Sequence, residues 1–465
     1  MTEVSTVLAH ARANLPQSEL RWFDLLRIPS ISAQPKHAND CSKAAHWLSG
    51  QLEEIGFDAK VHLTAGHPVV LAHHPGPGGD APHILYYGHY DVQPADPLDL
   101  WTSDPFEPAV VDGPHGRRVV ARGAVDDKGQ TMTWLEALRA WHERAGGPPA
   151  RVTVLIEGEE EVGSKNLDTF LEENADALRA DIVVISDTNM WDIDTPAIST
   201  RLRGLLYTQI DITAANRDLH SGMYGGSALN PINLLTRILG DLKAEDGTIR
   251  IPGFYDNVQE LPQELRRQWA TLGFDEKKFL GDIGLSVPSG ESGRSALERL
   301  WARPTADING IWGGYTGEGS KTVIAAEAHA KLSFRLVPGQ VPSDIIKGLY
   351  DFLMDRMPED ARAKIQVFSH GQAIEVPADG PWVRAAQEAL SEEFGRPAVL
   401  IGCGGSIPVV ESFRRVLGMD SLLVGFGLDD DQVHSPNEKF ELRCFERGVG
   451  SHVRLLAKLA AVKGA

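Results

Sequence analysis

Short apolar runs alternate with amphipathic segments along the first 200 residues of the chain. Residues 85–87, 152–156 and 182–185 are runs of the apolar and aromatic residues that form buried strands. Residues 127–144, between the first two runs, have the period of an amphipathic helix. The apolar side of this predicted helix is formed by Met132, Leu135, Leu138 and Trp141. Strands and helices that alternate in this way indicate a mostly parallel sheet flanked by helices.

The pattern changes after residue 204, where strands with one apolar face replace the continuous apolar runs. A half-buried strand is predicted at 205–213, and Asn230-Pro231 opens a helix that runs to about residue 242. Residues 243–306 are rich in Gly, Pro and charge, and we expect an irregular stretch there. The elements predicted next are a strand at 328–337, a helix at 343–357 and a strand near 364–368. This order resembles the β-α-β-β-α-β unit of a small open-faced sandwich.

A linker at 377–381 precedes a helix at 382–394 that resumes the first pattern. Because His434 lies beyond the inserted unit and is a candidate ligand, we expect the last segment to return to the first domain. We therefore predict an α/β protein of two domains. A catalytic domain with a mostly parallel sheet flanked by helices is made of residues 1–203 and 378–465, and an α+β sandwich at 204–377 interrupts it.

Composition narrows the possible partners and the compartment. With 42% hydrophobic and 7% aromatic residues, the 465-residue chain has the composition of globular proteins. Its formal net charge of -19 argues against a nucleic-acid or an anionic-membrane partner. The first residues lack the basic and apolar regions of a signal peptide, and no apolar run approaches the ~18 residues of a membrane span. We therefore expect a cytoplasmic protein, in which the three widely spaced cysteines are reduced.

Polar motifs follow the predicted strands of the first domain, at the points where the strands end. In an α/β sheet the ligand site lies at the carboxyl ends of the strands, so motifs far apart in sequence converge there. Two imidazoles and several carboxylates at one edge of a sheet are the ligands of a two-metal hydrolytic site. The residues in these motifs are His89, Asp91, Asp126, Asp127, Glu159, Glu160, Glu161, Asp187 and, much later, His434.

Each motif taken alone has a structural explanation. His89 and Asp91 could be a surface pair, although a carboxylate two residues away can also fix the tautomer of a metal-binding imidazole. Asp126-Asp127 could start a helix, which explains one aspartate better than two. The acidic run 159–161 could be a solvated turn, and His434 a loop histidine. The run follows a buried strand, however, where cations would relieve the repulsion and one glutamate could ligate while its neighbour stays free as a base.

Taken together, the motifs resemble those of the M20 metallopeptidase family, and within it the dipeptidases similar to cytosolic non-specific dipeptidase and carnosinase. The resemblance extends over nearly the whole chain. Besides the motifs above it includes Asp218-Leu-His220-Ser-Gly, Asn309-Gly310, Lys321-Thr322-Val-Ile, Phe334-Arg335-Leu-Val-Pro and Gly404-Gly405-Ser406-Ile-Pro.

The resemblance implies a co-catalytic pair of divalent cations, zinc in the first place and manganese as the alternative. Asp126 would bridge the two cations, and Glu160 would be the general base that acts on a metal-bridging water. The remaining ligands implied are His89 and Asp187 for one cation, and Glu161 and His434 for the other.

The resemblance also implies that the inserted domain is a lid and a dimerisation domain. From this domain His220 would complete the neighbouring subunit's site as an oxyanion donor. Arg335 suits a clamp on the substrate carboxylate, and Ser406 can add further donors. Asn309 and Thr322, which lie in matching motifs, would complete the substrate-binding set, and Asp91 would be a catalytic residue together with Glu160 and His220.

We therefore expect a homodimeric two-metal hydrolase that cleaves the peptide bond of dipeptides or short peptides. An N-acyl-amino-acid amidohydrolase or a carboxypeptidase of the same family is the first alternative. Asp187 favours the dipeptidase, because acylase-like and carboxypeptidase-like members have Glu at the matching position. A non-catalytic scaffold is the remote alternative, and the complete set of ligands together with Glu160 argues against it.

Overall fold

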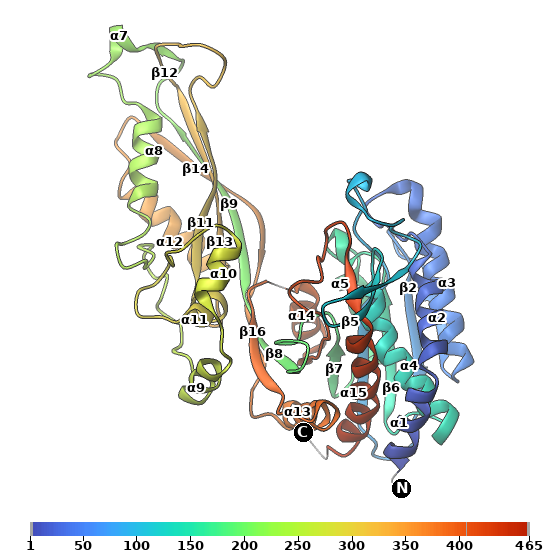
Figure 1. Ribbon diagram of the computed structural model, residues 1–465. Helices are drawn as coiled ribbons and strands as arrows, with labels where there is room; N and C mark the ends of the chain where they lie inside the picture. The colour runs from blue at the N-terminus through green and yellow to red at the C-terminus, as the bar shows by residue number, and fades with distance from the viewer. Residues whose placement is uncertain (1–2, 406, 463–465) are drawn as a thin grey trace. The chain divides into compact units, whose positions relative to one another are not determined.

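The computed structural model describes residues 3–405 and 407–462, and the chain divides into two compact units (Figure 1). The first unit is made of Met1–Thr200, Val376–Ile401 and Pro408–Ala465. The second is made of Arg201–Glu375 and Gly402–Ile407. The chain thus leaves the first unit twice, first to build most of the second unit and later to add one short segment to it.

A mixed sheet forms the centre of the first unit. Its central strands β6, β3, β7 and β17 are parallel neighbours, whereas β1, β2 and β8 are antiparallel to their partners. The prediction of a mostly parallel sheet therefore holds for the centre alone, because the sequences of the outer strands give no sign of their direction. In order across the sheet, the strands are β1 (Asp58–His62), β2 (Val69–His74), β6 (Arg151–Glu157), β3 (His83–His89), β7 (Ile182–Ile185), β17 (Ser421–Leu423), β8 (Ala197–Leu202) and β15 (Ile374–Glu375), and β16 (Val399–Cys403) also pairs with β8.

Helices cover this sheet, and α4 is the most deeply buried of them (Figure 1). It confirms the predicted helix at 127–144, and it packs against β3 and against the helices α1, α2 and α15. Every residue from Lys128 to Trp141 is buried, so the helix has no solvent face along most of its length. The helices of the unit are α1 (Glu3–Ala13), α2 (Leu15–Leu26), α3 (Ala38–Glu54), α4 (Lys128–Ala145), α5 (Leu167–Glu173), α6 (Ala175–Leu178), α13 (Pro381–Phe394), α14 (Pro408–Ser412) and α15 (Leu442–Ala460). None of the described helices is both long enough and apolar enough to span a bilayer.

A second, small sheet of the first unit joins two distant segments of the chain. Its strands are β4 (Ala109–Gly113), β5 (Gly116–Val120) and β18 (Lys439–Glu441). Lys439 pairs with Val120 in an antiparallel register, so the C-terminal segment lies beside the loop that follows β5.

The second unit contains the predicted β-α-β-β-α-β order. Its four strands are all antiparallel and lie in the order β11-β13-β9-β14. Along β9 and β13 buried and half-buried residues alternate, and the buried set packs with α8 and α12 in one apolar core. The elements are β9 (Gly204–Thr213), α8 (Pro231–Gly240), β11 (Thr305–Gly313), β13 (Glu327–Leu336), α12 (Pro342–Met354) and β14 (Arg362–Gly371).

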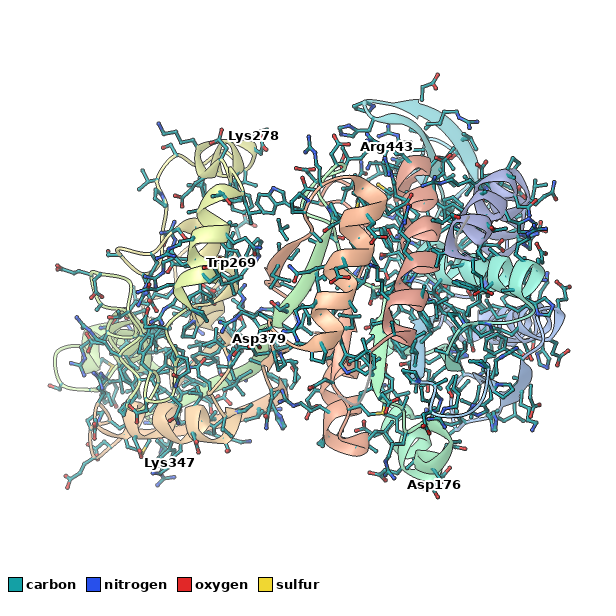
Figure 2. The ribbon with its side chains drawn as sticks, turned by 90° about the horizontal axis from the view of Figure 1, so that it is seen from below. Asp176, Trp269, Lys278, Lys347, Asp379 and Arg443 are labelled. Atoms are coloured by element: carbon teal, nitrogen blue, oxygen red, sulfur yellow. The ribbon has the colours of Figure 1, made fainter. Side chains whose placement is uncertain are left out.

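The stretch at 243–306, which we expected to be irregular, contains three short helices. They are α9 (Gln263–Thr271), α10 (Glu276–Asp282) and α11 (Ala296–Trp301). Figure 2 shows Trp269 on α9 and Lys278 on α10. Each helix is too short for its apolar period to stand out, and side-chain caps stabilise the first turns of α10 and α11. At α11, for example, Ser295 and Glu298 form a capping box.

Candidate metal centre

Five side chains of the first unit form two donor groups that share Asp126. His89 and Asp187 complete one group, and Glu161 and His434 complete the other. Within each group the donor atoms lie within 4.8 Å of one another. The Nε2 atom of His89 lies 3.2 Å from Oδ1 of Asp126, whereas Nε2 of His434 lies 2.9 Å from Oδ2. The two oxygens of Asp126 therefore face different imidazoles, as a carboxylate that bridges two cations requires.

The last residue of β3, His89, is oriented by its own strand end. Its Nδ1 atom lies 3.1 Å from the backbone carbonyl oxygen of Asp91, which can accept the Nδ1 proton and leaves a lone pair on Nε2. That Nε2 atom is buried and makes no hydrogen bond with a described residue, yet it lies 4.0 Å from Oδ2 of Asp187. A buried nitrogen that makes no hydrogen bond and lies close to two carboxylates fits a divalent cation.

Asp91 connects the end of β3 with the turn that follows β6. Its two carboxylate oxygens accept hydrogen bonds from the backbone amides of Glu160 and Glu161, at 3.2 and 3.1 Å. The Nδ1 atom of His89 is 3.4 Å from the carboxylate and therefore closer to the Asp91 carbonyl. Asp91 thus positions both the imidazole and the acidic turn, and its buried carboxylate is neutralised mainly by amide dipoles.

The three glutamates at 159–161 point to different partners. Glu159 accepts a hydrogen bond from Nδ2 of Asn166 at 2.7 Å, away from the donor groups. Glu161 accepts one from Nε2 of Gln93 at 2.7 Å and lies 3.2 Å from His434. The carboxylate of Glu160 makes no hydrogen bond or ion pair with any other described residue, and burial raises its pKa to about 8. Such a carboxylate is suited to hold and release a proton near neutral pH.

Excess negative charge makes the cluster a candidate cation site. Burial, together with the charge of Asp126, raises the pKa of Asp187 to about 7. Close contacts with Asp126 and Glu161 raise the pKa of His434 to about 10. In the absence of cations, protons therefore remain on groups that would otherwise ligate, and bound cations would replace those protons.

The loop that carries Asp126 is held by Glu438, which our sequence analysis did not single out. Its Oε1 atom accepts hydrogen bonds from the amides of Val125 and Asp126 at 3.0 and 3.1 Å. Its Oε2 atom accepts from Nη1 of Arg122 at 2.7 Å and from the amide of Gly123 at 3.1 Å. The only feature of the sequence that could have indicated a role for Glu438 is its position in the same segment as His434.

The His434 segment itself has an unusual backbone. Gln432, His434 and Asn437 all have positive φ, at 56°, 61° and 64°. Residues other than glycine seldom adopt this conformation, and those that do cluster at functional sites. The side chain of Asn437 fixes the segment, because it accepts hydrogen bonds from the amide and the hydroxyl of Thr102 at 2.7 and 2.8 Å.

The remaining candidate residues belong to the second unit. His220 and Thr322 lie together, since His220 pairs with Val323 between the short strands β10 (Leu219–His220) and β12 (Val323–Ile324). Asn309 and Arg335 both line one cavity of that unit. Ser406 lies outside the described residues. The roles of these side chains stay predictions.

Comparison with a model of a protein family identifies the family of the chain. The model of peptidase family M20/M25/M40 matches residues 85–458, a range that includes every ligand candidate. The chain belongs to peptidase family M20/M25/M40. This confirms the family predicted from the motifs, and with it an enzyme of the metallopeptidase class.

Several M20 relatives match over most of their length. The Cys-Gly metallodipeptidase dug1 of Schizosaccharomyces pombe is 30% identical, with 94% of each chain covered. The Beta-Ala-His dipeptidase of Homo sapiens is 32% identical over 77% of this chain and 70% of its own. Among solved structures, the dipeptidase Dug1p from Saccharomyces cerevisiae is similar at a TM-score of 0.77, with 26% identity and full coverage of both chains. The M20 metallo-carboxypeptidase Sso-CP2 from Sulfolobus solfataricus has a TM-score of 0.81 and 30% identity, with 96% and 99% covered.

Replacement of Glu438 by Gln should destabilise this M20 peptidase and weaken its cation site. The substitution leaves the buried guanidinium of Arg122 without its anionic partner, a loss that typically costs about 3–5 kcal/mol. Chemical unfolding of the cation-free protein measures this free energy, and calorimetric titration measures the cation affinity. Glu107→Gln is the matched control, because Glu107 pairs with Arg27 at the exposed surface and should change stability by less than about 1 kcal/mol. Equal effects of the two substitutions would show that Glu438 does not hold the loop.

Proposed function

We propose that the chain is a two-metal dipeptidase in which Glu160 is the general base. The observation that carries the proposal is the pair of donor groups that share Asp126, with an unpaired Glu160 next to them. The relatives whose names describe dipeptidases support the substrate class. The ligands proposed are His89, Asp126 and Asp187 for one cation and Asp126, Glu161 and His434 for the other.

The side chains divide the chemistry between them. When bound, the two cations would supply Lewis acidity and lower the pKa of an attacking water toward neutrality. Glu160 takes a proton from the attacking water on its carboxylate and later delivers it to the leaving amine. Asp91 holds Glu160 in place through the backbone amide and keeps His89 in the tautomer with a free Nε2.

His220 is proposed as the oxyanion donor, contributed by the partner subunit of a homodimer. Its Nδ1 atom accepts a hydrogen bond from the amide of Gly222 at 3.0 Å, so the neutral ring carries its proton on Nε2. The ring is exposed, which leaves that N–H available to a partner. A Cβ atom at Gly222 would lie 3.0 Å from the ring, which accounts for glycine in the motif.

Substrate contacts are proposed for Arg335, Asn309, Thr322 and Ser406. Arg335 makes no ion pair with a described carboxylate, so its planar guanidinium is available to clamp a substrate carboxylate.

A carboxypeptidase is the second candidate, because the Sso-CP2 structure is similar at a TM-score of 0.81 and 30% identity. A panel of dipeptides, longer peptides and N-acetyl amino acids separates the candidates. A dipeptidase should cleave the dipeptides far faster than peptides of four or five residues. A carboxypeptidase should release the last residue of both, and an acylase should prefer the N-acetyl amino acids.

Chelation of divalent cations should abolish dipeptide hydrolysis, and Zn²⁺ or Mn²⁺ should restore it. The chain offers no nucleophile activated by a neighbouring base in the cluster, so the attacking water depends on the cations. Full activity of protein that elemental analysis shows to be free of metal would contradict the proposal.

Cation affinity should increase as the pH rises through about 7. Asp187 and His434, whose pKa values are raised to about 7 and about 10, must lose their protons before they can ligate. Calorimetric titrations in two buffers of different ionisation enthalpy should therefore show proton release on binding. Affinity that is constant between pH 6 and pH 8, two values chosen about one unit to either side of this pKa, would argue against these ligands.

Glu160→Gln and Glu161→Gln should have different effects, although the residues are adjacent. Glu160→Gln should keep both cations and lower kcat by at least ~10²–10⁴-fold, because proton transfer is lost. Glu161→Gln should instead weaken one cation site. The metal content after dialysis, measured together with kcat, distinguishes the effects of the two substitutions. If Glu160→Gln empties a site and Glu161→Gln does not, the two roles are exchanged.

His220→Ala should bind cations normally and lower kcat by roughly 10²–10³-fold, the typical cost of one oxyanion donor. Mixing it with Glu160→Gln protein under subunit exchange tests whether the residue acts across subunits. A heterodimer would hold one site with both lesions and one with neither, so activity should rise toward half that of the wild type. If native mass spectrometry shows heterodimers and activity does not return, His220 does not act across subunits.

A further inference from the structure

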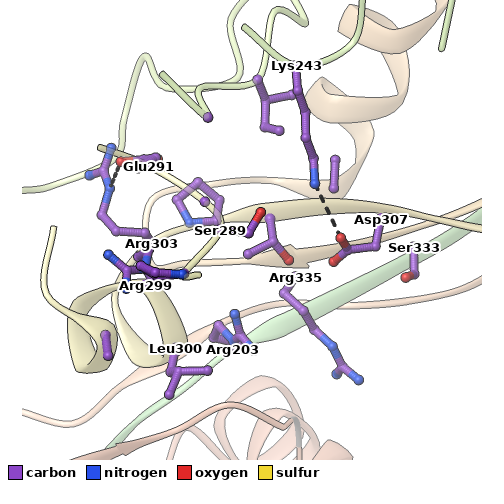
Figure 3. A pocket seen from close by; sticks show the side chains of 18 of the residues that line it. Arg203, Lys243, Ser289, Glu291, Arg299, Leu300, Arg303, Asp307, Ser333 and Arg335 are labelled. Atoms are coloured by element: carbon purple, nitrogen blue, oxygen red, sulfur yellow. Dashed lines mark hydrogen bonds and ion pairs between the residues drawn. The ribbon is translucent and has the colours of Figure 1, made fainter. Parts of the chain in front are cut away.

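A cavity of about 510 Å³ in the second unit is rich in positive charge (Figure 3). Its wall contains five cationic and three anionic side chains, although the protein as a whole has a net charge of -19. The cationic residues are Arg203, Lys243, Arg299, Arg303 and Arg335. The cavity thus has two positive charges in excess.

Three of the five cations are neutralised within the wall. Their ion pairs are Lys243–Asp307 at 3.3 Å, Arg303–Glu291 at 2.6 Å, and Arg299–Glu276. Figure 3 shows the first two as dashed lines, and no such line reaches Arg203 or Arg335. Neither of these two arginines makes an ion pair with a carboxylate in the part of the chain that the structure describes. The two excess charges are therefore those of Arg203 and Arg335.

The strand register places the two arginines near each other. Arg335 on β13 pairs with Leu205 on β9, and Arg203 immediately precedes β9, two residues before Leu205. Diagonal neighbours on paired strands are about 7–8 Å apart, so long side chains at such positions can reach a common ligand. Burial and the nearby charge of Arg335 lower the pKa of Arg203 to about 10. The guanidiniums therefore repel each other, and a bound anion would relieve that repulsion.

Arg203 is also fixed in position. It is the single residue between β8 and β9, and its backbone amide donates to the carbonyl of Gly405 at 3.2 Å. Its Nε atom donates to the carbonyl of Gly404 at 3.0 Å, which leaves the terminal nitrogens for a ligand. A Cβ atom at Gly404 would lie 3.2 Å from Nη2, so this glycine leaves space for the guanidinium. A guanidinium held in this way loses little entropy when an anion binds.

We propose that Arg203 and Arg335 together bind the C-terminal residue of a peptide whose side chain carries a second carboxylate, an aspartate or a glutamate. This assignment rests on the proposed peptidase function and makes its substrate class narrower. Arg335 binds the α-carboxylate, and Arg203 binds the side-chain carboxylate. Two unneutralised cations in one cavity match two negative charges, and Ser333 and Asn309 in the same wall supply neutral donors.

Two dipeptides of equal size, Ala-Glu and Ala-Gln, test the assignment. Their Kd values are measured by calorimetry with the metal-loaded Glu160→Gln protein, which binds without cleaving. Ala-Glu should bind about tenfold more tightly than Ala-Gln, as one added charge-assisted hydrogen bond provides. In the Arg203→Met background the ratio of the two Kd values should fall to about one, and the Kd of Ala-Gln should change by less than about threefold. Arg203→Lys should keep part of the preference for Ala-Glu, because it keeps the positive charge. Lys243→Met is the control, because Lys243 is already paired with Asp307 and should leave the ratio unchanged.

The ratio is measured within each variant, so a general loss of folded protein cancels. If Arg203→Met does not fold, the Kd ratios of the Arg203→Lys protein and of the parent protein still test the assignment. Equal binding of the two dipeptides by the parent protein would overturn the assignment, as would an Arg203 substitution that weakens both equally. Inorganic phosphate that binds in an Arg203-dependent manner, without any preference for Ala-Glu, would show a site for free anions and also overturn it. If no dipeptide is bound or cleaved, the proposed function fails as well, whereas cleavage without the preference leaves that function intact.

Discussion

Carboxylates that gather at one edge of a sheet repel one another, and the first unit is arranged around this repulsion. Asp91 is neutralised by two backbone amides, and Glu438 by three amides and Arg122. The imidazoles of His89 and His434 face the two oxygens of Asp126. The charges of Glu160 and Asp187 are not compensated by a neighbouring group in this way. This explains why burial raises the pKa values of both carboxyl groups strongly. In the proposed function divalent cations would supply the missing positive charge, so the affinity for metal would be a property of the whole arrangement.

Much of this arrangement could be predicted from the sequence, because the polar motifs come directly after strands. Those strands are recognisable from their apolar runs. His89, Glu160 and Asp187 come after such runs, and parallel strands bring their ends to one edge. Glu438 could not be found in the same way. Its importance comes from hydrogen bonds with amides more than 300 residues earlier in the chain, and no local pattern records those contacts.

The helices at 263–301 show a similar limit within the second unit. A helix of six or seven residues has fewer than two turns. Its sequence therefore shows too little of the apolar period to be distinguished from the sequence of a loop. The cavity wall is built in part from these helices and in part from strand ends, and its excess charge depends on which cations find partners. Five arginines and lysines in a sequence do not tell which three are neutralised, since the pairing is fixed by tertiary contacts alone.

The contact between Glu438 and the Asp126 loop has a consequence for the order of synthesis. The loop is translated more than 300 residues before the segment that supplies Glu438 and His434. While the chain is still on the ribosome, the early strands can pair with one another, but the amides of Val125 and Asp126 lack their acceptor and one imidazole is missing. The nascent chain therefore has at most half of the candidate metal site until the segment with His434 and Glu438 emerges. If the chain is the hydrolase proposed above, incomplete chains are inactive because this one short segment is still missing.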